Sequence, residues 1–282
     1  MIAIADSGST KTMWLLSDGR GRNVEFKTIG FNPYFVTKEE VESCISEAFP
    51  KDVDSNEITD VYFYGSGCSN CDNYGHLQSA LAAFFGRANI NIYSDMLGTA
   101  RAVLKHEAGV AAILGTGSNS CFYDGEKITG NAVSLGYILG DEGSGATMGK
   151  TFIKLYLEGK LEEELTRKIK EETGENITTV LNSVYKGEHP NRYLANFTKT
   201  INAHIEHPQM QDIVRQSFRD FFCNYLIIYP DYRKYRIGFC GSIAYHFKGI
   251  LLDELVRIGY ATENVLIINE VLPELLIYHT GE

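Results

Sequence analysis

Cysteine, proline and tryptophan are scarce in this chain of 282 residues, which contains six, six and one of them, respectively. Six cysteines in a chain of this length are too few for the disulfide framework of small secreted domains, so we expect reduced thiols. No stretch approaches the roughly 20 apolar residues that a membrane-spanning helix needs. Asp6 also interrupts the apolar N-terminus before the core of a signal peptide can form. We therefore expect a cytoplasmic protein with no membrane partner.

Positive charge is also in short supply. Lysine and arginine number 26 against 36 aspartates and glutamates, which gives a formal net charge of −10. Such a chain lacks the basic surface that binds nucleic acid, and we expect no nucleic-acid partner. Its 44% hydrophobic and 22% charged residues form an ordinary globular mixture, which excludes disordered and fibrous proteins. The length suits two domains or one large domain.

The first third of the chain alternates apolar strand patterns with helical patterns. Glycine-rich and polar turns separate the strands, and apolar residues spaced three or four apart mark the helices. This order predicts a mixed α/β sheet covered by helices. The predicted strands lie at 2–5, 13–16, 24–29, 61–64 and 90–93, and the predicted helices at 38–49, 76–85 and 96–106.

The rest of the chain repeats this order around a long helical middle. Both halves place a polar glycine loop between two apolar strands, which predicts a duplicated lobe. A charged run at 160–172 is typical of a solvated helix face. The predicted strands lie at 110–114, 120–123, 127–129, 236–240 and 264–268, and the predicted helical regions at 148–185, 193–229, 247–258 and 273–278.

Three glycine loops follow apolar strands, and backbone amides in such loops can cradle phosphate oxygens. The loop at 8–12 lacks the glycine before lysine that a Walker loop requires. The loop at 115–120 lacks the last glycine of a dinucleotide-binding motif. P-loop and Rossmann sites are therefore excluded, and each loop taken singly is more often a tight turn than a phosphate site.

Taken together, the loops at 6–12, 114–119 and 238–244 resemble the two phosphate motifs and the adenosine motif of the superfamily that contains actin, sugar kinases and heat-shock ATPases. Two further segments, YSDMLGTA at 93–100 and GYILGDEGS at 136–144, are similar to motifs of the BadF/BadG/BcrA/BcrD-type ATPases. Within that group, the chain looks most like the eukaryotic-type N-acetylglucosamine kinases. The resemblance spans nearly the whole chain.

The resemblance implies two ribonuclease-H-like lobes of the actin-like ATPase type, with ATP bound in a central cleft. The expected N-terminal lobe comprises 1–105 plus 270–282, and the C-terminal lobe comprises 106–269 with a helical insertion. The match is weakest at 151–235. The implied reaction is ATP-dependent phosphorylation of an amino sugar, with N-acetylglucosamine as the leading acceptor and Mg²⁺ as the metal.

The resemblance also assigns residues to the nucleotide. The carboxylate of Asp6 would hold Mg²⁺ through water, and a strand-end turn is the alternative reading of its loop. Lys11 is left undecided between a phosphate contact and a solvated loop. Gly241 and Ser242 are expected at the start of a helix beside the adenosine, and the alternative is that they serve only ordinary packing of a strand against a helix. The residues assigned to nucleotide binding are Asp6, Gly8, Ser9, Thr10, Lys11, Thr116, Gly117, Ser118, Gly241 and Ser242.

Asp95 is the expected general base, which accepts the proton of the sugar hydroxyl as that oxygen attacks the γ-phosphorus. Its alternative role is a helix N-cap, for which aspartate is locally favoured. Amide and carboxylate groups suit the hydroxyl and acetamido groups of an amino sugar. The residues assigned to the sugar are Asn32, Gly67, Asn119, Gly136, Tyr137 and Asp141. Tyr137 stands where the animal enzymes of this family have a tryptophan. The alternative role of Asn32 is that of a turn residue before Pro33.

Two other functions remain open at this stage. Cys68 and Cys71 form a CxxC pair, and some BadF-type ATPases are activators of 2-hydroxyacyl-CoA dehydratases that hold an iron–sulfur cluster between two subunits. The alternative is that these two cysteines are inert thiols in a loop. A sugar-sensing regulator without turnover is the third reading, but it has no need of both Asp6 and Asp95. The sequence does not decide the acceptor sugar, the phosphorylated hydroxyl or whether the chain forms a homodimer.

Overall fold

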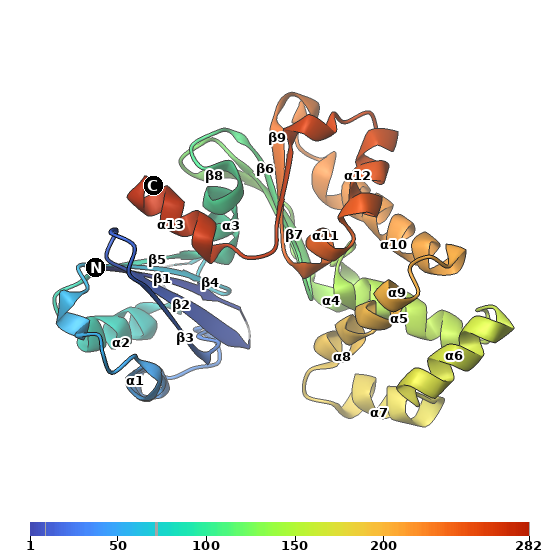
Figure 1. The fold of residues 1–282 in the computed structure, drawn as a ribbon, viewed down its shortest axis with the longest axis horizontal. Helices are drawn as coiled ribbons and strands as arrows, with labels where there is room; N and C mark the ends of the chain where they lie inside the picture. Colours follow the sequence, from blue (N-terminus) through green and yellow to red (C-terminus); the bar gives the residue numbers. More distant parts are fainter. Residues whose placement is uncertain (9, 71–72, 282) are drawn as a thin grey trace. The chain divides into compact units, whose positions relative to one another are not determined.

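The computed structural model describes residues 1–8, 10–70 and 73–281. It divides into two compact units (Figure 1). Unit 1 comprises Met1–His106 with Glu270–Glu282, and unit 2 comprises Glu107–Asn269. Each unit contains one mixed five-stranded sheet with helices, so the predicted fold class, α/β with two lobes, is confirmed.

The sheet of unit 1 has the strand order β3-β2-β1-β4-β5. The first three strands form an antiparallel meander, and β4 and β5 add to β1 in parallel. Parallel neighbours need a crossover, and helices supply it here. The strands are β1 (Ile2–Ser7), β2 (Lys11–Ser17), β3 (Asn23–Ile29), β4 (Asp60–Gly65) and β5 (Asn89–Ser94).

Helices cover both faces of this sheet. On one side lie α1 (Lys38–Ala48) and α2 (Gly75–Phe85), and on the other α3 (Asp95–Leu104) and α13 (Leu272–Thr280), as Figure 1 shows. A capping box starts α1, because Thr37 accepts from the Glu40 backbone and the Glu40 side chain accepts from Thr37. A short 3-10 helix, η1 (Ser55–Glu57), precedes β4.

The sheet of unit 2 has the order β10-β9-β6-β7-β8, which is the arrangement of unit 1 repeated. An antiparallel meander of β6, β7 and β8 is extended in parallel by β9 and β10. The predicted duplication is therefore confirmed in the strand order. The strands are β6 (Gly109–Leu114), β7 (Ser118–Tyr123), β8 (Ile128–Asn131), β9 (Arg236–Cys240) and β10 (Val265–Ile268).

The helical middle of unit 2 is divided into short helices. Its α4 was not predicted, because four residues are too few to show a helical period. A further cluster of short helices follows β9. The helical elements are α4 (Gly136–Leu139), α5 (Gly145–Leu157), α6 (Glu163–Thr173), α7 (Ile177–Lys186), α8 (Pro190–Asn196), α9 (Thr198–Ala203), α10 (Pro208–Phe221), the π-helix η3 (Phe222–Leu226), the 3-10 helices η4 (Tyr232–Lys234) and η5 (Thr262–Asn264), α11 (Ser242–His246) and α12 (Lys248–Arg257).

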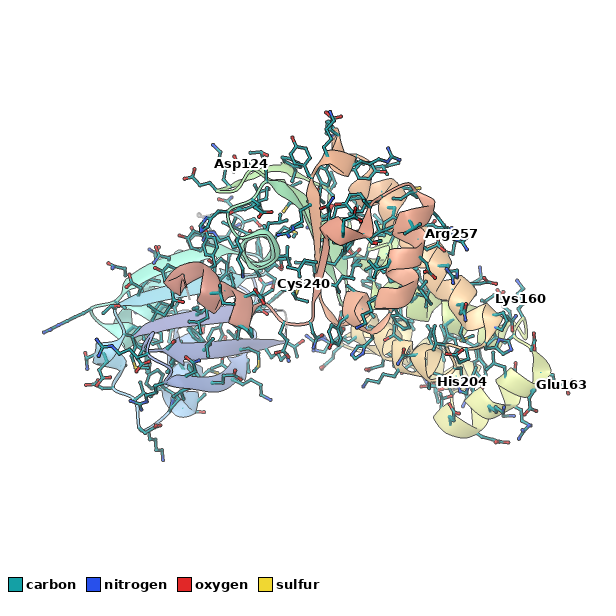
Figure 2. All side chains as sticks on the ribbon, turned by 45° about the horizontal axis from the view of Figure 1, so that its top comes forward. Asp124, Lys160, Glu163, His204, Cys240 and Arg257 are labelled. Atoms are coloured by element: carbon teal, nitrogen blue, oxygen red, sulfur yellow. The ribbon has the colours of Figure 1, made fainter. Side chains whose placement is uncertain are left out.

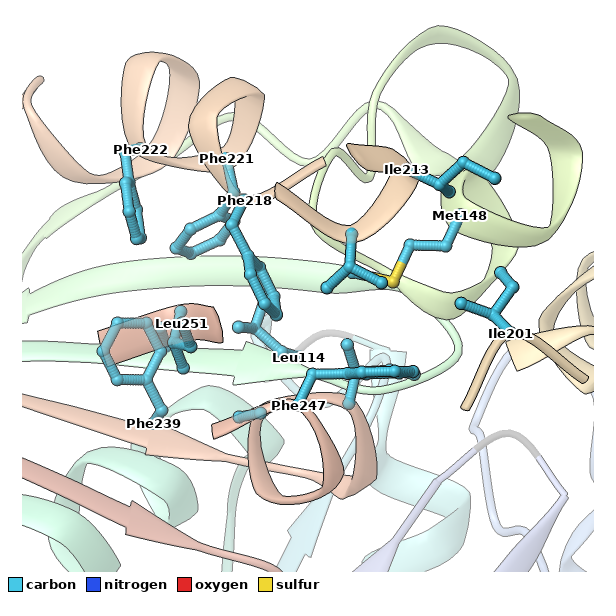
Figure 3. Close-up of a cluster of buried hydrophobic side chains, with 14 of the residues drawn as sticks. Leu114, Met148, Ile201, Ile213, Phe218, Phe221, Phe222, Phe239, Phe247 and Leu251 are labelled. Atoms are coloured by element: carbon cyan, nitrogen blue, oxygen red, sulfur yellow. The ribbon is translucent and has the colours of Figure 1, made fainter. Parts of the chain in front are cut away.

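Aromatic and aliphatic side chains pack together in the core of unit 2 (Figure 3). Phe218 and Phe221 of α10 pack with Phe239 of β9 and Leu251 of α12, and all four are fully buried. This core packs against the sheet whose strands lead into the glycine loops of unit 2. Burial of each such side chain is worth about 1.5–3 kcal/mol.

The charged run at 160–172 lies on and just before α6, as predicted for a solvated face. Figure 2 shows Lys160 and Glu163 at the periphery of the unit. Leu165 and Ile169 of α6 are buried, whereas Arg167 forms exposed ion pairs on the same helix. Within the described residues, no helix is both long and apolar enough to cross a membrane.

Candidate functional site

Three parallel strands of unit 1 end side by side. Ser7 of β1 is in register with Gly65 of β4, and Gly65 is in register with Ser94 of β5. The residues that follow these strand ends therefore emerge at one edge of the sheet, where α/β proteins commonly bind ligands. The Ser66 N–H donates to the Ser7 carbonyl at 2.9 Å, which joins two of the emerging loops.

Two partly buried carboxylates lie at this edge. Asp6 is the fifth residue of β1, and Asp95 is the first residue of α3. Burial, and after it the negative charge of Asp95, raises the pKa of Asp6 to about 6, while Lys11 acts in the opposite direction. Burial also raises the pKa of Asp95. The structure thus brings Asp6 and Asp95 together.

The capping role considered for Asp95 belongs to its neighbour. The N-cap of α3 is Ser94, whose hydroxyl accepts from the Leu97 N–H at 3.2 Å. Asp95 Oδ1 accepts from the adjacent Met96 N–H at 2.8 Å, which opposes the effect of burial on its pKa. Asp95 is therefore not needed to cap the helix.

Gly8 and Thr10 lie between β1 and β2, which are antiparallel neighbours. The Gly8 N–H donates to the Lys11 carbonyl at 3.1 Å, and Thr10 is exposed. Lys11 is the first residue of β2 rather than a loop residue, and its exposed ammonium lies near enough to lower the pKa of Asp6. Ser9 lies outside the described residues.

The buried hydroxyl of Ser7 joins β2 to the segment that contains Asn32. It accepts from Thr12 Oγ1 at 2.8 Å and from the Phe31 N–H at 2.9 Å. Gly67 has φ 84°, and a Cβ there would lie 2.7 Å from Asn32 Oδ1. Asn32 and Gly67, assigned separately to the sugar, are therefore adjacent. Asn32 also accepts from the Tyr34 N–H at 3.0 Å, so its alternative turn role is present as well.

In unit 2, the turn at 115–117 connects β6 to β7 and is fixed to the start of α5. The Gly115 N–H donates to the Gly117 carbonyl at 3.0 Å. The carbonyls of Gly115 and Thr116 accept from the N–H groups of Gly145 and Ala146 at 2.8 and 3.1 Å. The first turn of a helix leaves its backbone N–H groups without partners inside the helix. In α5, two of these N–H groups hold the 115–117 turn in place.

Asp141 lies against this turn with only 8% of its surface exposed. A Cβ at Gly117 would lie 2.9 Å from Asp141 Oδ2, and the Ser118 N–H donates to the Asp141 carboxylate. Burial raises the pKa of Asp141, and the Ser118 contact partly offsets this. Its φ of 59° is uncommon for a non-glycine residue and marks a locally constrained backbone. The structure thus brings Gly117, Ser118 and Asp141 together.

The third glycine loop lies beside the same turn. Gly241 precedes α11 with φ 115°, and a Cβ there would lie 2.5 Å from the Leu114 carbonyl oxygen and 3.4 Å from the Gly115 nitrogen. Ser242 follows it and is exposed. Two loops separated by more than 100 residues therefore meet at the ends of β6 and β9, as the resemblance implied.

The remaining sugar assignments lie on two other elements of unit 2. Asn119 lies within β7 opposite Ile113 and accepts from the Ser120 N–H at 2.8 Å. Gly136 and Tyr137 begin α4, which leads directly into Gly140 and Asp141. The half-buried Tyr137 ring packs against the core of unit 2. Its backbone carbonyl accepts from Lys150 Nζ at 3.3 Å.

Sequence reasoning missed two residues of the site. Ser7 was not assigned a role, although its small buried hydroxyl serves two hydrogen bonds. Glu270 contributes a negative charge that raises the pKa of Asp6, and no local pattern connects positions so far apart in the chain.

The thiol of Cys68 is buried, and burial, with a smaller contribution from Asp95, raises its pKa to about 12. Such a thiol is poorly suited to ligation or nucleophilic chemistry. Cys71 lies outside the described residues. Across residues 1–8, 10–70 and 73–281, no group of three or more histidine, cysteine, aspartate or glutamate side chains forms a metal-binding cluster.

A scan against protein-family models found no match, and a search of curated proteins found none either. Solved structures do match. A Porphyromonas gingivalis protein named "Putative N-acetylglucosamine Kinase" is 35% identical, with a TM-score of 0.92, and the alignment covers 100% of this chain and 99% of that one.

Two more distant structures share the fold alone. A Chromobacterium violaceum protein with the same name is 16% identical, with a TM-score of 0.72 and 99% of each chain covered. A ROK family glucokinase from Streptomyces griseus, solved with glucose and AMPPNP, is 15% identical, with a TM-score of 0.53 and coverage of 95% and 93%. The two-lobed α/β architecture is that of the actin-like sugar kinases. From its identity to the Porphyromonas gingivalis protein over the full length, this chain belongs to the same family as that protein.

Proposed function

We propose that this protein is a sugar kinase that transfers the γ-phosphoryl group of ATP to a hydroxyl of an amino sugar, with N-acetylglucosamine as the first candidate acceptor. The observation that carries the proposal is the pair of carboxylates, Asp6 and Asp95, at the edge where three parallel strands end. It is supported by 35% identity to a protein named for this activity.

Asp95 is proposed as the general base. The acceptor oxygen forms a bond to the γ-phosphorus as the bond from that phosphorus to the β–γ bridging oxygen breaks, and the hydroxyl proton passes to Asp95. The products are ADP and the sugar phosphate. A carboxylate whose pKa is raised by burial is a better proton acceptor than an exposed one, because general-base catalysis improves as the pKa approaches the working pH.

Asp6 is proposed as the metal-binding carboxylate. Kinases commonly hold Mg²⁺ through one or two carboxylates together with the substrate phosphates. Asp6 fits this role, because two other negative charges, those of Asp95 and Glu270, act on it and favour a nearby cation. When bound, Mg²⁺ neutralises charge on the transferred phosphoryl group.

The nucleotide contacts are proposed to come from three loops. In unit 1 these are Gly8, Ser9, Thr10 and Lys11. In unit 2 they are Thr116, Gly117 and Ser118 of the β6–β7 turn, together with Gly241 and Ser242 before α11. Support comes from the hydrogen bonds that fix the turn to α5 and from the close approach of Gly241 to that turn. A pre-positioned loop binds phosphate without a further ordering cost.

The acceptor sugar is proposed to contact Asn32 and Gly67 in unit 1 and Asn119, Gly136, Tyr137 and Asp141 in unit 2. Asn32 and Gly67 are adjacent, and Asp141 lies against Gly117 and Ser118, which are assigned to the phosphates. The amide and carboxylate groups can make paired hydrogen bonds to hydroxyl and acetamido groups.

The test uses the purified protein with MgATP and separate incubations with N-acetylglucosamine, N-acetylmuramic acid and glucose. ADP release gives the rate, mass spectrometry identifies the sugar phosphate, and phosphorus NMR identifies the phosphorylated hydroxyl. We expect kcat/KM for N-acetylglucosamine to exceed that for glucose by about tenfold or more, because the site can hydrogen-bond the acetamido group. A preference for glucose would overturn the substrate assignment. No phosphorylation of any of these sugars, or a brown iron-containing preparation, would overturn the kinase assignment.

A further inference from the structure

Tyr64 lies directly beneath the helix that begins with Asp95. Its side chain on β4 is fully buried, and its backbone is in register with Asp6 of β1. At Gly98, one turn into α3, a Cβ would lie 2.8 Å from the Tyr64 ring. The first turn of α3 therefore rests on the Tyr64 ring, and the ring position sets the height of the helix above the sheet.

The hydroxyl of Tyr64 is held from two directions. Arg101 Nη1, farther along α3, donates to Tyr64 Oη at 2.9 Å. His279 Nε2, on α13, lies 2.8 Å from the same oxygen. Because the guanidinium can only donate, the Tyr64 proton is available to point at His279, and Nε2 can accept it when the neutral ring carries its proton on Nδ1.

Aromatic rings hold both partners of the hydroxyl. The Arg101 guanidinium lies 4.3 Å from the centre of the Tyr93 ring on β5 and 5.3 Å from that of Tyr278 on α13. The His279 ring stacks on Tyr62 of β4, with ring centres 3.6 Å apart and an angle of 19° between the planes. One network thus connects β4, β5, α3 and α13.

From this network we propose that Tyr64, Arg101 and His279 are positioning residues for Asp95: they fix α3 against β4 and α13 and thereby fix where the Asp95 carboxylate stands. The inference rests on the proposed kinase function. Tyr64 touches α3 at Gly98 and Arg101 but is not itself a member of the proposed catalytic or binding set. A positional error of roughly 1 Å at a reacting group can cost about 100-fold in rate.

The neutral form of His279 is the one that the network requires. Burial, and after it the charge of Arg101, lowers the pKa of His279 to about 4. The groups facing its ring are Tyr62 and Tyr64 on β4, Arg101 on α3 and Tyr278 on its own helix. A protonated His279 would be a donor with no acceptor lone pair on Nε2 and would lie near the positive Arg101.

The experiment compares four variants of the full chain. Tyr64→Phe removes the hydroxyl but keeps the ring, and His279→Leu removes the acceptor. His279→Gln restores an acceptor oxygen. Tyr62→Phe is the matched control on the same strand, because no hydrogen bond to the Tyr62 hydroxyl is found within the described residues. For each variant, kcat, KM for ATP, Tm and the hydrogen-exchange rates of the α3 amides 96–98 are measured.

We expect Tyr64→Phe and His279→Leu to lower kcat by about tenfold or more while KM for ATP stays within about twofold, since the network acts through Asp95 rather than through the nucleotide loops. The α3 amides should exchange faster in both. His279→Gln should keep kcat within about threefold of wild type, and Tyr62→Phe should match wild type.

Three outcomes would overturn the inference: an unchanged kcat in Tyr64→Phe, a loss in Tyr62→Phe as large as that in Tyr64→Phe, or a loss of Tm without a specific effect on kcat. Absence of sugar phosphorylation by the wild-type protein would instead overturn the proposed function. In that case the exchange rates alone would still decide whether the network holds α3, and unchanged rates would reject it.

Discussion

Gly241 and the carbonyl oxygen of Leu114 approach each other so closely that a Cβ at position 241 would lie 2.5 Å from that oxygen. The φ of Gly241, 115°, is also one that other residues rarely adopt. The contact joins the start of α11 to the end of β6, and no residue with a side chain can replace the glycine without moving backbone.

Gly241→Ala is therefore expected to lower the free energy of unfolding by about 1–3 kcal/mol, the cost of a strained backbone conformation, and to weaken ATP binding. Chemical denaturation and nucleotide titration measure the two effects. Gly249→Ala is the control, because nothing lies within 4 Å of its would-be Cβ and its φ is ordinary. It should be neutral or slightly stabilising. Equal losses in both variants would contradict the packing argument.

Asp6 contributes a pH-dependent instability. Its pKa is about 6 in the folded protein against 3.8 when exposed, chiefly because of burial. Between these values the folded state binds more protons than the unfolded state, so the stability of the protein falls as the pH rises from about 4 to about 6 and stays lower above. Asp6→Asn should thus raise the free energy of unfolding by about 1–3 kcal/mol at pH 8 and much less at pH 4.

The same variant should lose sugar phosphorylation, so stability and activity change in opposite directions at pH 8. Asp124→Asn is a control with the opposite sign, since backbone N–H groups of Lys127 and Glu126 lower the pKa of Asp124. It should lower stability at pH 8. Urea denaturation at both pH values checks the prediction, and an Asp6→Asn variant less stable than wild type at pH 8 would refute it.

His279 affects the stability of the protein over an overlapping pH range, but in the opposite direction to Asp6. Its pKa is about 4 in the folded protein against 6.5 when exposed, chiefly because of burial. Its contribution is fully present above pH 6.5 and is lost as the pH falls towards 4. The stability difference between wild type and His279→Gln should therefore be about 1–3 kcal/mol more in favour of wild type at pH 7 than at pH 4. A difference independent of pH would show that His279 titrates normally.

Glu254 joins α12 to α10 through buried charge. Only 1% of its surface is exposed, and its carboxylate accepts from Arg215 Nη1 at 3.1 Å and from Arg219 Nε at 2.8 Å. Glu254→Gln should cost about 2–4 kcal/mol of folding free energy, because it removes the buried negative charge beside Arg215, which is only 19% exposed, and leaves this arginine only the exposed carboxylate of Asp253.

The neighbouring Asp253 supplies the matched control. It contacts Arg215 at 3.4 Å, but 62% of its side chain is exposed. Asp253→Asn should change the free energy of unfolding by no more than about 0.5 kcal/mol, as exposed ion pairs usually do. Denaturation in low and high salt distinguishes the two variants. The loss of stability in Glu254→Gln should persist in 1 M NaCl, because an ionic strength of about that size screens exposed charges far more than buried ones.

Asp95→Asn is expected to lower kcat for sugar phosphorylation by about 10²–10⁴-fold, the usual contribution of a general base. The dissociation constant for ATP should stay within about threefold of wild type, because the side chain acts on the acceptor. Stopped-assay kinetics and nucleotide titration give the two numbers. Asp52→Asn, at an exposed aspartate paired with Arg22, should leave both unchanged. Equal losses of turnover and ATP affinity would show that Asp95 is structural.

The strands and the longer helices could be predicted because their apolar periods are local. The resemblance assigned Asp6 and Asp95 to one site, and the structure places both where the parallel strands of unit 1 end, with the charge of Asp95 acting on Asp6. Prediction was wrong where short-range detail decides: Lys11 begins β2 rather than standing in the loop, and the four-residue α4 was missed. The sequence did not decide whether Asp95 caps α3, and the structure shows that Ser94 is the N-cap.

The spacing of residues close together in the chain was enough to predict the α/β class, the duplicated order of strands and the three glycine loops, and the resemblance to the actin-like ATPases implied the two lobes. Three further relationships come from tertiary packing alone: Gly241 lies against Leu114, the charge of Glu270 acts on Asp6, and His279 meets Tyr64 across 215 positions. Such contacts arise when whole strands and helices pack, and no local pattern of side chains encodes which distant groups then meet.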